Sequence, residues 1–183
     1  MDQRFEPPIG DSAIGDTDVK QPRAWLEDKC GVEVDFAQLR GFGTVLTEEV
    51  QLSQLSRGYC VENVVETIER ALAGGPPRAV VLLGASGSGK TAIVGELAHR
   101  LAAQGWHLLR IAPADFLTGT VYLGEWQTRL SKLIAAVSRP RPIVLYIPNL
   151  EELSSVGKSS SSDSNIASAL ATYIERGDIV LLG

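Results

Sequence analysis

The chain has 183 residues and a formal net charge of −5. This length suits one domain with a buried core, and the acidic balance argues against a nucleic-acid partner, whose surface usually requires a basic stripe. Cys30 and Cys60 are too few for a disulfide framework and lack metal-ligand spacing, so we expect reduced thiols in a cytoplasmic protein. No secretory signal follows Met1 and no apolar stretch reaches the roughly twenty residues that cross a bilayer, so we expect no membrane partner.

The first third of the chain has no strong hydrophobic period. Residues 1–22 are rich in Pro, Gly and Asp, which predicts a mobile lead-in. Residues 23–60 hold short amphipathic pieces and a weak helix at 47–55, so we expect a short helical or irregular linker there. The domain itself is expected over residues 61–183.

That domain alternates helices and strands. The apolar spacing predicts helices at 61–72, 91–103, 126–137 and 166–174, and strands at 79–83, 107–111, 143–147 and 179–182. The strand at 79–83 is expected to be buried, and Glu62, Glu66, Glu69 and Arg70 are expected to form a solvated helix face. This alternation predicts the α/β class, with a three-layer αβα arrangement around a parallel sheet. Ligands of such sheets bind at the carboxyl ends of the strands.

The main motif lies between the strand at 79–83 and the next helix, and it fits G-x-x-x-x-G-K-[ST]. It consists of Gly84, Ala85, Ser86, Gly87, Ser88, Gly89, Lys90 and Thr91. Where a strand meets a helix, backbone N–H groups and the helix dipole point at one anion, and glycines let phosphate oxygens approach. Lys90 is expected to reach the β- and γ-phosphates, and the Thr91 hydroxyl to bind Mg²⁺. A chance Gly/Ser-rich turn is the alternative, and the flanking elements argue against it.

The order of segments from about residue 26 to residue 183 resembles the first nucleotide-binding domain of the Clp-type AAA+ unfoldases and disaggregases. The similar stretches are RGYCVENVVETIERAL from Arg57, GASGSGKTAIVGELAHRL from Gly84, LTGTVYLGEWQTRL from Leu117, and IVLYI from Ile143, followed by a Ser-rich loop and RGDIVLLG. The resemblance implies a partial AAA+ P-loop domain over residues 61–183 that binds ATP and Mg²⁺. It further implies a chaperone-like ATPase ring of like subunits, homo- or hetero-oligomeric, that remodels or unfolds polypeptide clients.

The same resemblance implies that Tyr122 is the pore-loop aromatic that grips the polypeptide. An ordinary loop tyrosine is the alternative. The residues on either side, Val121 and Leu123, replace the Lys and Arg of the family pattern and make the segment more apolar.

The chain departs from the family pattern at the end of the strand at 143–147. The family has Asp-Glu there, to orient Mg²⁺ and polarise the attacking water, and this chain has Pro148-Asn149. Proline offers no ligand, and an asparagine cannot accept a proton as a general base. Hydrolysis is therefore in doubt, and the catalytic group stays unknown. The candidates are Asn149, Glu151 and Glu152, of which a glutamate would need a local shift to reach the metal.

The sequence given also stops after the fourth expected strand, before the family's polar sensor residue, arginine finger, fifth strand and helical lid. We therefore expect an AAA+ core truncated after the fourth strand, with no lid, whose strand at 79–83 lies at the sheet edge. An exposed apolar edge invites pairing with another chain. Either the chain is a fragment or a partner covers the edge. Two functions stay open, an ATPase module and a pseudo-ATPase scaffold whose nucleotide supports assembly with partners. A small-molecule kinase with the same loop is a third, less favoured alternative.

Overall fold

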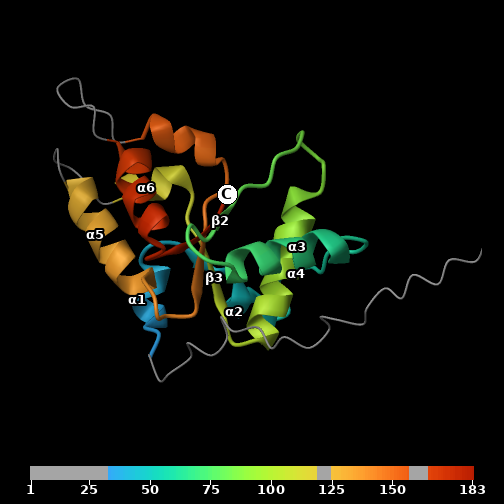
Figure 1. The fold of residues 1–183 in the computed structure, drawn as a ribbon. Helices are drawn as coiled ribbons and strands as arrows, with labels where there is room; N and C mark the ends of the chain where they lie inside the picture. Colours follow the sequence, from blue (N-terminus) through green and yellow to red (C-terminus); the bar gives the residue numbers. More distant parts are fainter. Residues whose placement is uncertain (1–32, 119–124, 157–164) are drawn as a thin grey trace, which may run out of the picture.

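A mixed sheet forms the centre of the computed structural model, which describes residues 33–118, 125–156 and 165–183. In this part of the chain, five strands lie in the order β1-β3-β4-β5-β2. Their bounds are Thr44–Val45 for β1, Ala79–Val80 for β2, His107–Arg110 for β3, Ile143–Tyr146 for β4 and Val180–Leu182 for β5. Helices cover both faces (Figure 1).

The strand pairing confirms the expected α/β class and corrects one detail. Strands β3, β4, β5 and β2 are parallel neighbours, and all four were predicted within a few residues. Strand β1 was not predicted, and it pairs with β3 in the antiparallel direction, with Thr44 opposite Arg110. The sheet is therefore mostly, not wholly, parallel.

The helices follow the predicted apolar periods. They are α1 Phe36–Arg40, α2 Leu46–Gln51, α3 Glu62–Ala73, α4 Lys90–Ala103, α5 Glu125–Val137 and α6 Ile166–Arg176, with short 3₁₀ helices η2 Pro113–Leu117 and η3 Leu150–Ser154. Gly177 ends α6 in the left-handed conformation that helix C-termini favour. None of the described helices is both long and apolar enough to cross a membrane.

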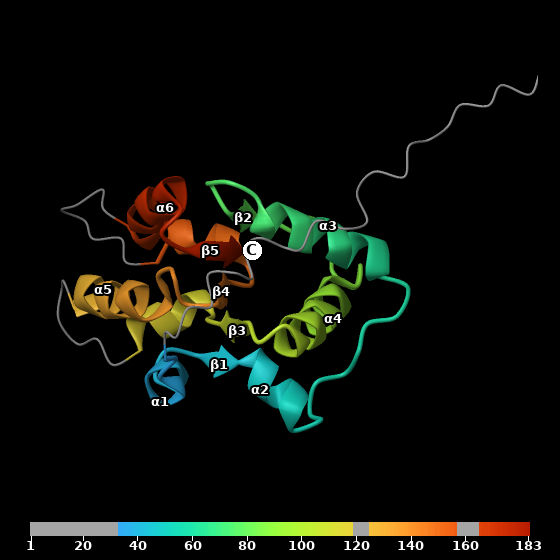
Figure 2. The ribbon, with the colours of Figure 1, turned by 60° about the horizontal axis from the view of Figure 1, so that its bottom comes forward.

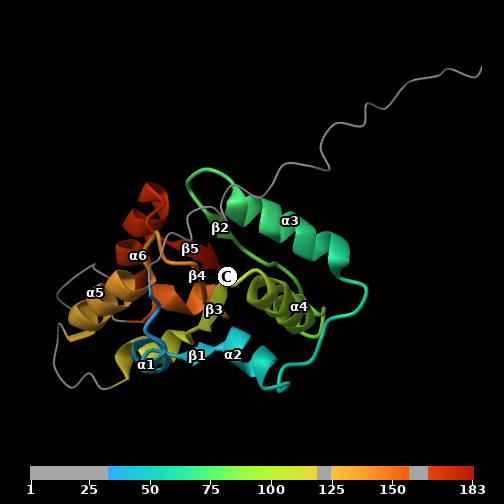
Figure 3. The ribbon, with the colours of Figure 1, turned by 90° about the horizontal axis from the view of Figure 1, so that it is seen from below.

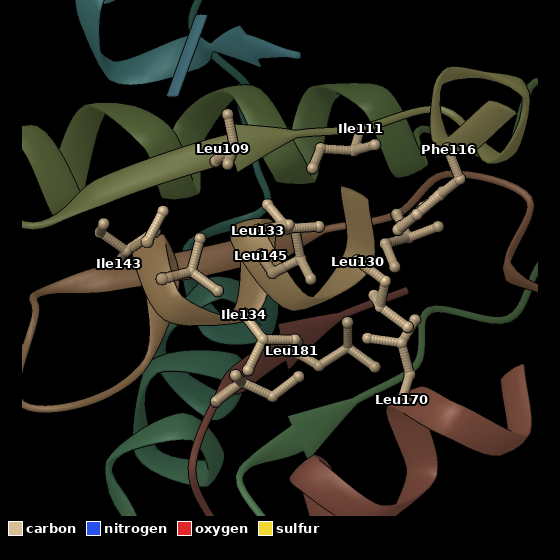
Figure 4. Packing of buried hydrophobic residues seen from close by; sticks show 14 of the residues in the cluster. Leu109, Ile111, Phe116, Leu130, Leu133, Ile134, Ile143, Leu145, Leu170 and Leu181 are labelled. Atoms are coloured by element: carbon tan, nitrogen blue, oxygen red, sulfur yellow. The ribbon is translucent and has the colours of Figure 1, made fainter. Parts of the chain in front are cut away.

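Alternating strand side chains supply two hydrophobic cores, one on each face of the sheet. Helices α1, α5 and α6 cover one face and α2, α3 and α4 cover the other (Figures 2 and 3). Figure 4 shows the first core, where strand residues meet α5 and α6. The first core takes Leu109, Leu145 and Leu181 from the strands, and the second takes Leu108, Val144 and Val180. These two cores and the sheet make the predicted three layers.

The expected linker at 23–60 contributes to both cores where the structure describes it. Leu39 and Val45, 1% and 2% exposed, belong to the first core, and Leu46 belongs to the second. The expected lead-in at 1–22, like residues 23–32, lies outside the described residues. The division of the chain at residue 60 stays a prediction.

The strand before the glycine-rich loop is not buried as predicted. Among the described strands, β2 lies at the edge of the sheet. Its pairing with the chain of β5 continues past Val80, because Leu82 N donates at 2.7 Å to the carbonyl oxygen of Gly183, the residue after β5. Val81 and Leu83 are 51% and 91% exposed.

The prediction of a solvated face on α3 is wrong for Glu69. This residue is only 6% exposed. Its Oε1 accepts a hydrogen bond from Gln104 Nε2 at 2.8 Å, and its Oε2 lies 3.3 Å from Arg100 Nη1. Glu69 therefore joins α3 to the far end of α4, while Glu62, Glu66 and Arg70 are exposed.

Candidate functional site

The glycine-rich loop joins β2 to α4 (Figure 1). Gly87 and Gly89 have φ of 77° and 88°, a left-handed backbone that a side chain would strain. Gly89 is the N-cap of α4, so the loop delivers the chain directly into the first turn of a 14-residue helix. The N–H groups of such a turn have no intrahelical acceptors, and the helix dipole adds a partial positive charge there.

Lys90 is the first residue of α4, and its side chain donates hydrogen bonds to this loop. Its Nζ donates to Gly84 O at 2.6 Å and to Ala85 O at 3.0 Å. The loop also closes on itself through Ser88 N, which donates to Ala85 O at 3.2 Å. The ammonium group is thus held among loop carbonyls, beside the residues that the motif assigns to phosphate binding.

The loop opens onto a cavity of about 730 Å³. Its lining includes the loop, with Lys90 and Thr91, and the end of β4 with the residues that follow it, among them Tyr146, Asn149 and Glu151. Among the described residues that line the cavity, Lys90 and Glu151 carry the only charged side chains. The structure therefore brings the predicted phosphate loop to the carboxyl ends of the strands, where α/β sheets bind ligands.

The three candidate catalytic residues do not share one environment. Asn149 has a left-handed backbone, with φ of 54°, and its Nδ2 donates to Glu152 Oε1 at 3.1 Å. Glu151 lines the cavity. All three are exposed, and Pro148 is half-buried beside them. Tyr122, the candidate pore-loop aromatic, lies outside the described residues.

Tyr146 is a site residue that the sequence analysis did not single out. Burial raises its pKa above the ordinary 10.0, and the positive charge of Arg110 opposes part of that effect. The phenol is therefore neutral and is a hydrogen-bond donor at neutral pH. Tyr146 is the last residue of β4, so it lies at the carboxyl end of that strand, where sheets of this class bind ligands.

The segment before α3 lies along the start of α4. A Cβ at Gly58 would come within 2.3 Å of Ala92 O, so only glycine fits against that helix. His99 Nε2 is 3.0 Å from Leu55 O, so this histidine joins α4 to the segment before α3. The sequence analysis gave Gly58 no role, although it lies within the stretch from Arg57 that carries the resemblance.

The described residues fit a nucleotide with its metal better than a protein-caged metal. The loop offers backbone donors, a lysine and a helix N-terminus to an anion. In the described part of the chain, no three His, Cys, Asp or Glu side chains converge on a metal position. Mg²⁺ is commonly held by phosphates, waters and only one or two protein groups, such as the Thr91 hydroxyl.

Comparison with known proteins identifies the family. The sequence pattern of the AAA ATPase domain matches residues 55–176. The chain belongs to the AAA ATPase family. Among curated relatives, this AAA ATPase chain is 23% identical over 175 residues to the ATP-dependent Clp protease ATP-binding subunit ClpE of Lactococcus lactis, covering 90% of this chain and 21% of that one. It is 30% identical over 164 residues to the chaperone protein ClpB 2 of Parasynechococcus marenigrum, covering 83% of this chain and 17% of that one.

Solved structures share the fold of this AAA ATPase chain. The Hsp104:casein complex of S. cerevisiae in its extended conformation has a TM-score of 0.69 at 24% identity, covering 80% of this chain and 26% of that one. The S. cerevisiae Hsp104-ADP complex has a TM-score of 0.65 at 24% identity, covering 79% of this chain and 26% of that one. The predicted resemblance to Clp-type AAA+ ATPases and the predicted P-loop fold class are confirmed. The chain spans about a fifth of the length of the curated relatives it matches.

Proposed function

We propose that this chain is an ATP-binding AAA+ module of Clp-like type, part of a ring ATPase that remodels or unfolds polypeptides. The observation that carries the proposal is the cavity at the carboxyl ends of the strands, lined by Lys90, Thr91 and the positive-φ glycines of the loop. An anion of triphosphate size in that cavity meets both the lysine and the start of α4. Family membership favours ATP.

The chain's own groups can perform the binding without a large rearrangement. Lys90 Nζ moves from the carbonyls of Gly84 and Ala85 to phosphate oxygens, exchanging two neutral acceptors for charged ones. The N–H groups of the loop and of the first turn of α4 donate to the same phosphates. The Thr91 hydroxyl offers an oxygen to Mg²⁺, which neutralises phosphate charge when it is bound.

The residues after β4 argue against efficient hydrolysis. Pro148 and Asn149 stand where the family has its metal-orienting and water-polarising carboxylates. The side chain of Asn149 also donates a hydrogen bond to Glu152. Neither Pro148 nor Asn149 can therefore act as a general base. The specific alternative is therefore a pseudo-ATPase scaffold, in which bound nucleotide supports assembly with partners and is turned over slowly or not at all.

Phosphate release from the purified full chain with Mg²⁺ and ATP separates these two functions. Turnover that disappears in a Lys90→Ala variant supports the ATPase module. Nucleotide binding that depends on Lys90, without measurable turnover, supports the scaffold. A wild-type chain that binds no ATP contradicts both functions.

The proposal also includes assembly into a ring and the binding of polypeptide clients. Its support is the similarity to ClpE, ClpB 2 and Hsp104, one structure of which is a complex with casein. Native mass spectrometry of the chain with and without ATP tests assembly, and a monomer under both conditions counts against the ring. If Tyr122 grips the client, Tyr122→Ala lowers the binding of an unfolded polypeptide while ATP affinity is unchanged.

A further inference from the structure

We propose that Glu151 supplies the carboxylate that this chain presents to the divalent cation of a bound nucleotide, in place of the acidic residues lost at Pro148 and Asn149. The inference rests on the proposed nucleotide site. It starts from the side chains that line the cavity, because Lys90 and Glu151 carry the only charged side chains in its described lining. One is suited to phosphate and the other to the cation that accompanies phosphate.

The hydrogen bonds distinguish Glu151 from the two other candidates. Asn149 Nδ2 donates to Glu152 Oε1 at 3.1 Å, so these two side chains are engaged with each other. The described part of the chain places no hydrogen bond or ion pair on the Glu151 carboxylate, and its backbone oxygen accepts from the Ser154 hydroxyl. Glu151 is therefore the acidic side chain available to the cavity.

The 3₁₀ helix η3 explains why the two adjacent glutamates differ. A 3₁₀ helix has about three residues per turn, so residues three apart share a side and consecutive residues do not. Leu153 is 1% exposed and Leu150 packs against the same core, which fixes the buried side of η3. Leu150 also lies against the end of β5, where a Cβ at Gly183 would come within 2.8 Å of it. Glu151 and Glu152 must then occupy the two remaining sides.

The expected size of the effect follows from Coulomb's law. A carboxylate about 5 Å from a divalent cation, with one water between them, changes affinity by roughly tenfold even at a dielectric close to that of water. Replacing the carboxylate by an amide of the same shape removes this attraction. It leaves the contacts of Lys90 with the loop unchanged.

The test is a titration of a fluorescent ATP analogue into the full chain, first with Mg²⁺ and then with EDTA. The measured quantity is the affinity with Mg²⁺ divided by the affinity with EDTA. This ratio reports on the metal and does not require turnover. In Glu151→Gln this ratio falls about tenfold while the affinity in EDTA is unchanged or slightly higher. Glu151→Ala gives the same fall. Glu152→Gln, the competing candidate, and Glu175→Gln, an exposed glutamate on α6, keep the wild-type ratio.

Two results would overturn the inference without touching the proposed function. One is an unchanged ratio in both Glu151 variants, with wild-type binding that still depends on Lys90. The other is an equal fall in Glu152→Gln. If wild type binds the analogue under neither condition, the nucleotide site itself is wrong and this inference fails with it.

Discussion

The ion-pair network between α3 and α4 allows a stability prediction worked from distances. Arg100 Nη1 lies 3.3 Å from Glu69 Oε2 and 3.8 Å from Glu66 Oε1, and Arg100 Nε lies 3.8 Å from Glu96 Oε1. The side chains of Glu69 and Glu96 are 7% and 10% exposed, against 22% for Arg100. Arg100→Met keeps most of the aliphatic stem and removes the cation that these buried carboxylates share.

Two limits bracket the loss of stability. Removing one partner of a fully buried pair costs about 3–5 kcal/mol, whereas an exposed pair is worth about 0–1 kcal/mol. The network lies between them, because Gln104 Nε2 still donates to Glu69 at 2.8 Å and Arg57 Nε still lies 3.6 Å from Glu96 Oε2. That last contact is an ion pair too long to satisfy Oε2 as a hydrogen bond. We expect Arg100→Met to lower the free energy of unfolding by about 2 kcal/mol.

Urea unfolding of the full chain, followed by far-ultraviolet circular dichroism, measures this loss as a fall in midpoint at an unchanged slope. Arg70→Met, at an exposed position on α3, is the matched control and should change stability by less than about 0.5 kcal/mol. Adding Glu69→Gln to Arg100→Met should recover part of the loss, because glutamine carries no charge and still accepts from Gln104. Equal losses in Arg100→Met and Arg70→Met would refute the reasoning.

Three further predictions concern the core, the loop and pH. Leu145→Ala, at a fully buried position of β4, should lower the free energy of unfolding by about 2–5 kcal/mol, whereas Val64→Ala, 44% exposed on α3, should lower it by well under half as much in the same urea titration. Gly89→Val should weaken ATP binding at least about tenfold by calorimetry, since a branched side chain strains a φ of 88° by roughly 1–3 kcal/mol; unchanged affinity would show that the loop tolerates another backbone. Burial raises the pKa of Tyr146 above 10.0, so the unfolded chain loses this proton at a lower pH than the folded chain. The contribution of the neutral Tyr146 phenol to the free energy of unfolding is therefore complete below pH 10 and is lost as the pH rises above it. Tyr146→Phe should therefore flatten the alkaline fall of the thermal midpoint, and identical alkaline slopes would contradict the assignment.

The sequence predicted the elements whose signals are local and repeated. The helix at 91–103 and the strands at 107–111 and 143–147 carry unambiguous apolar periods, and their observed bounds differ by a residue or so. Strand β1 has only two residues, so no period exists to detect it. Its position depends on pairing with β3, which is a tertiary contact.

The misassigned Glu69 did leave a signal in the sequence. It lies four residues after Val65 and three before Leu72, so helical geometry places it on the buried face. The charge of Glu69 favoured the prediction of an exposed side chain. Its carboxylate can be buried because Arg100 and Gln104, on and just after the packed helix α4, pair with it. A buried charge needs its partner, and that partner is 31 residues away.

The residues of the candidate site were also predictable only where their signal in the sequence is local. The glycine-rich loop is a contiguous motif, so its residues were predictable together, as was the loss of carboxylates at Pro148 and Asn149. The difference between Glu151 and Glu152 was not predictable, because it depends on the left-handed backbone of Asn149 and the 3₁₀ helix that follows. Neither feature has a clear pattern in the sequence.

Calorimetric titration of ATP with Mg²⁺ into the folded full chain, beside the Lys90→Ala variant, tests the central claim most directly. We expect a saturable heat from wild type with one nucleotide per chain, and an affinity at least about tenfold weaker in Lys90→Ala, because the charged hydrogen bonds to phosphate are lost. A wild-type chain that is folded by circular dichroism and gives no heat of binding, or a variant that binds as tightly as wild type, would contradict the account.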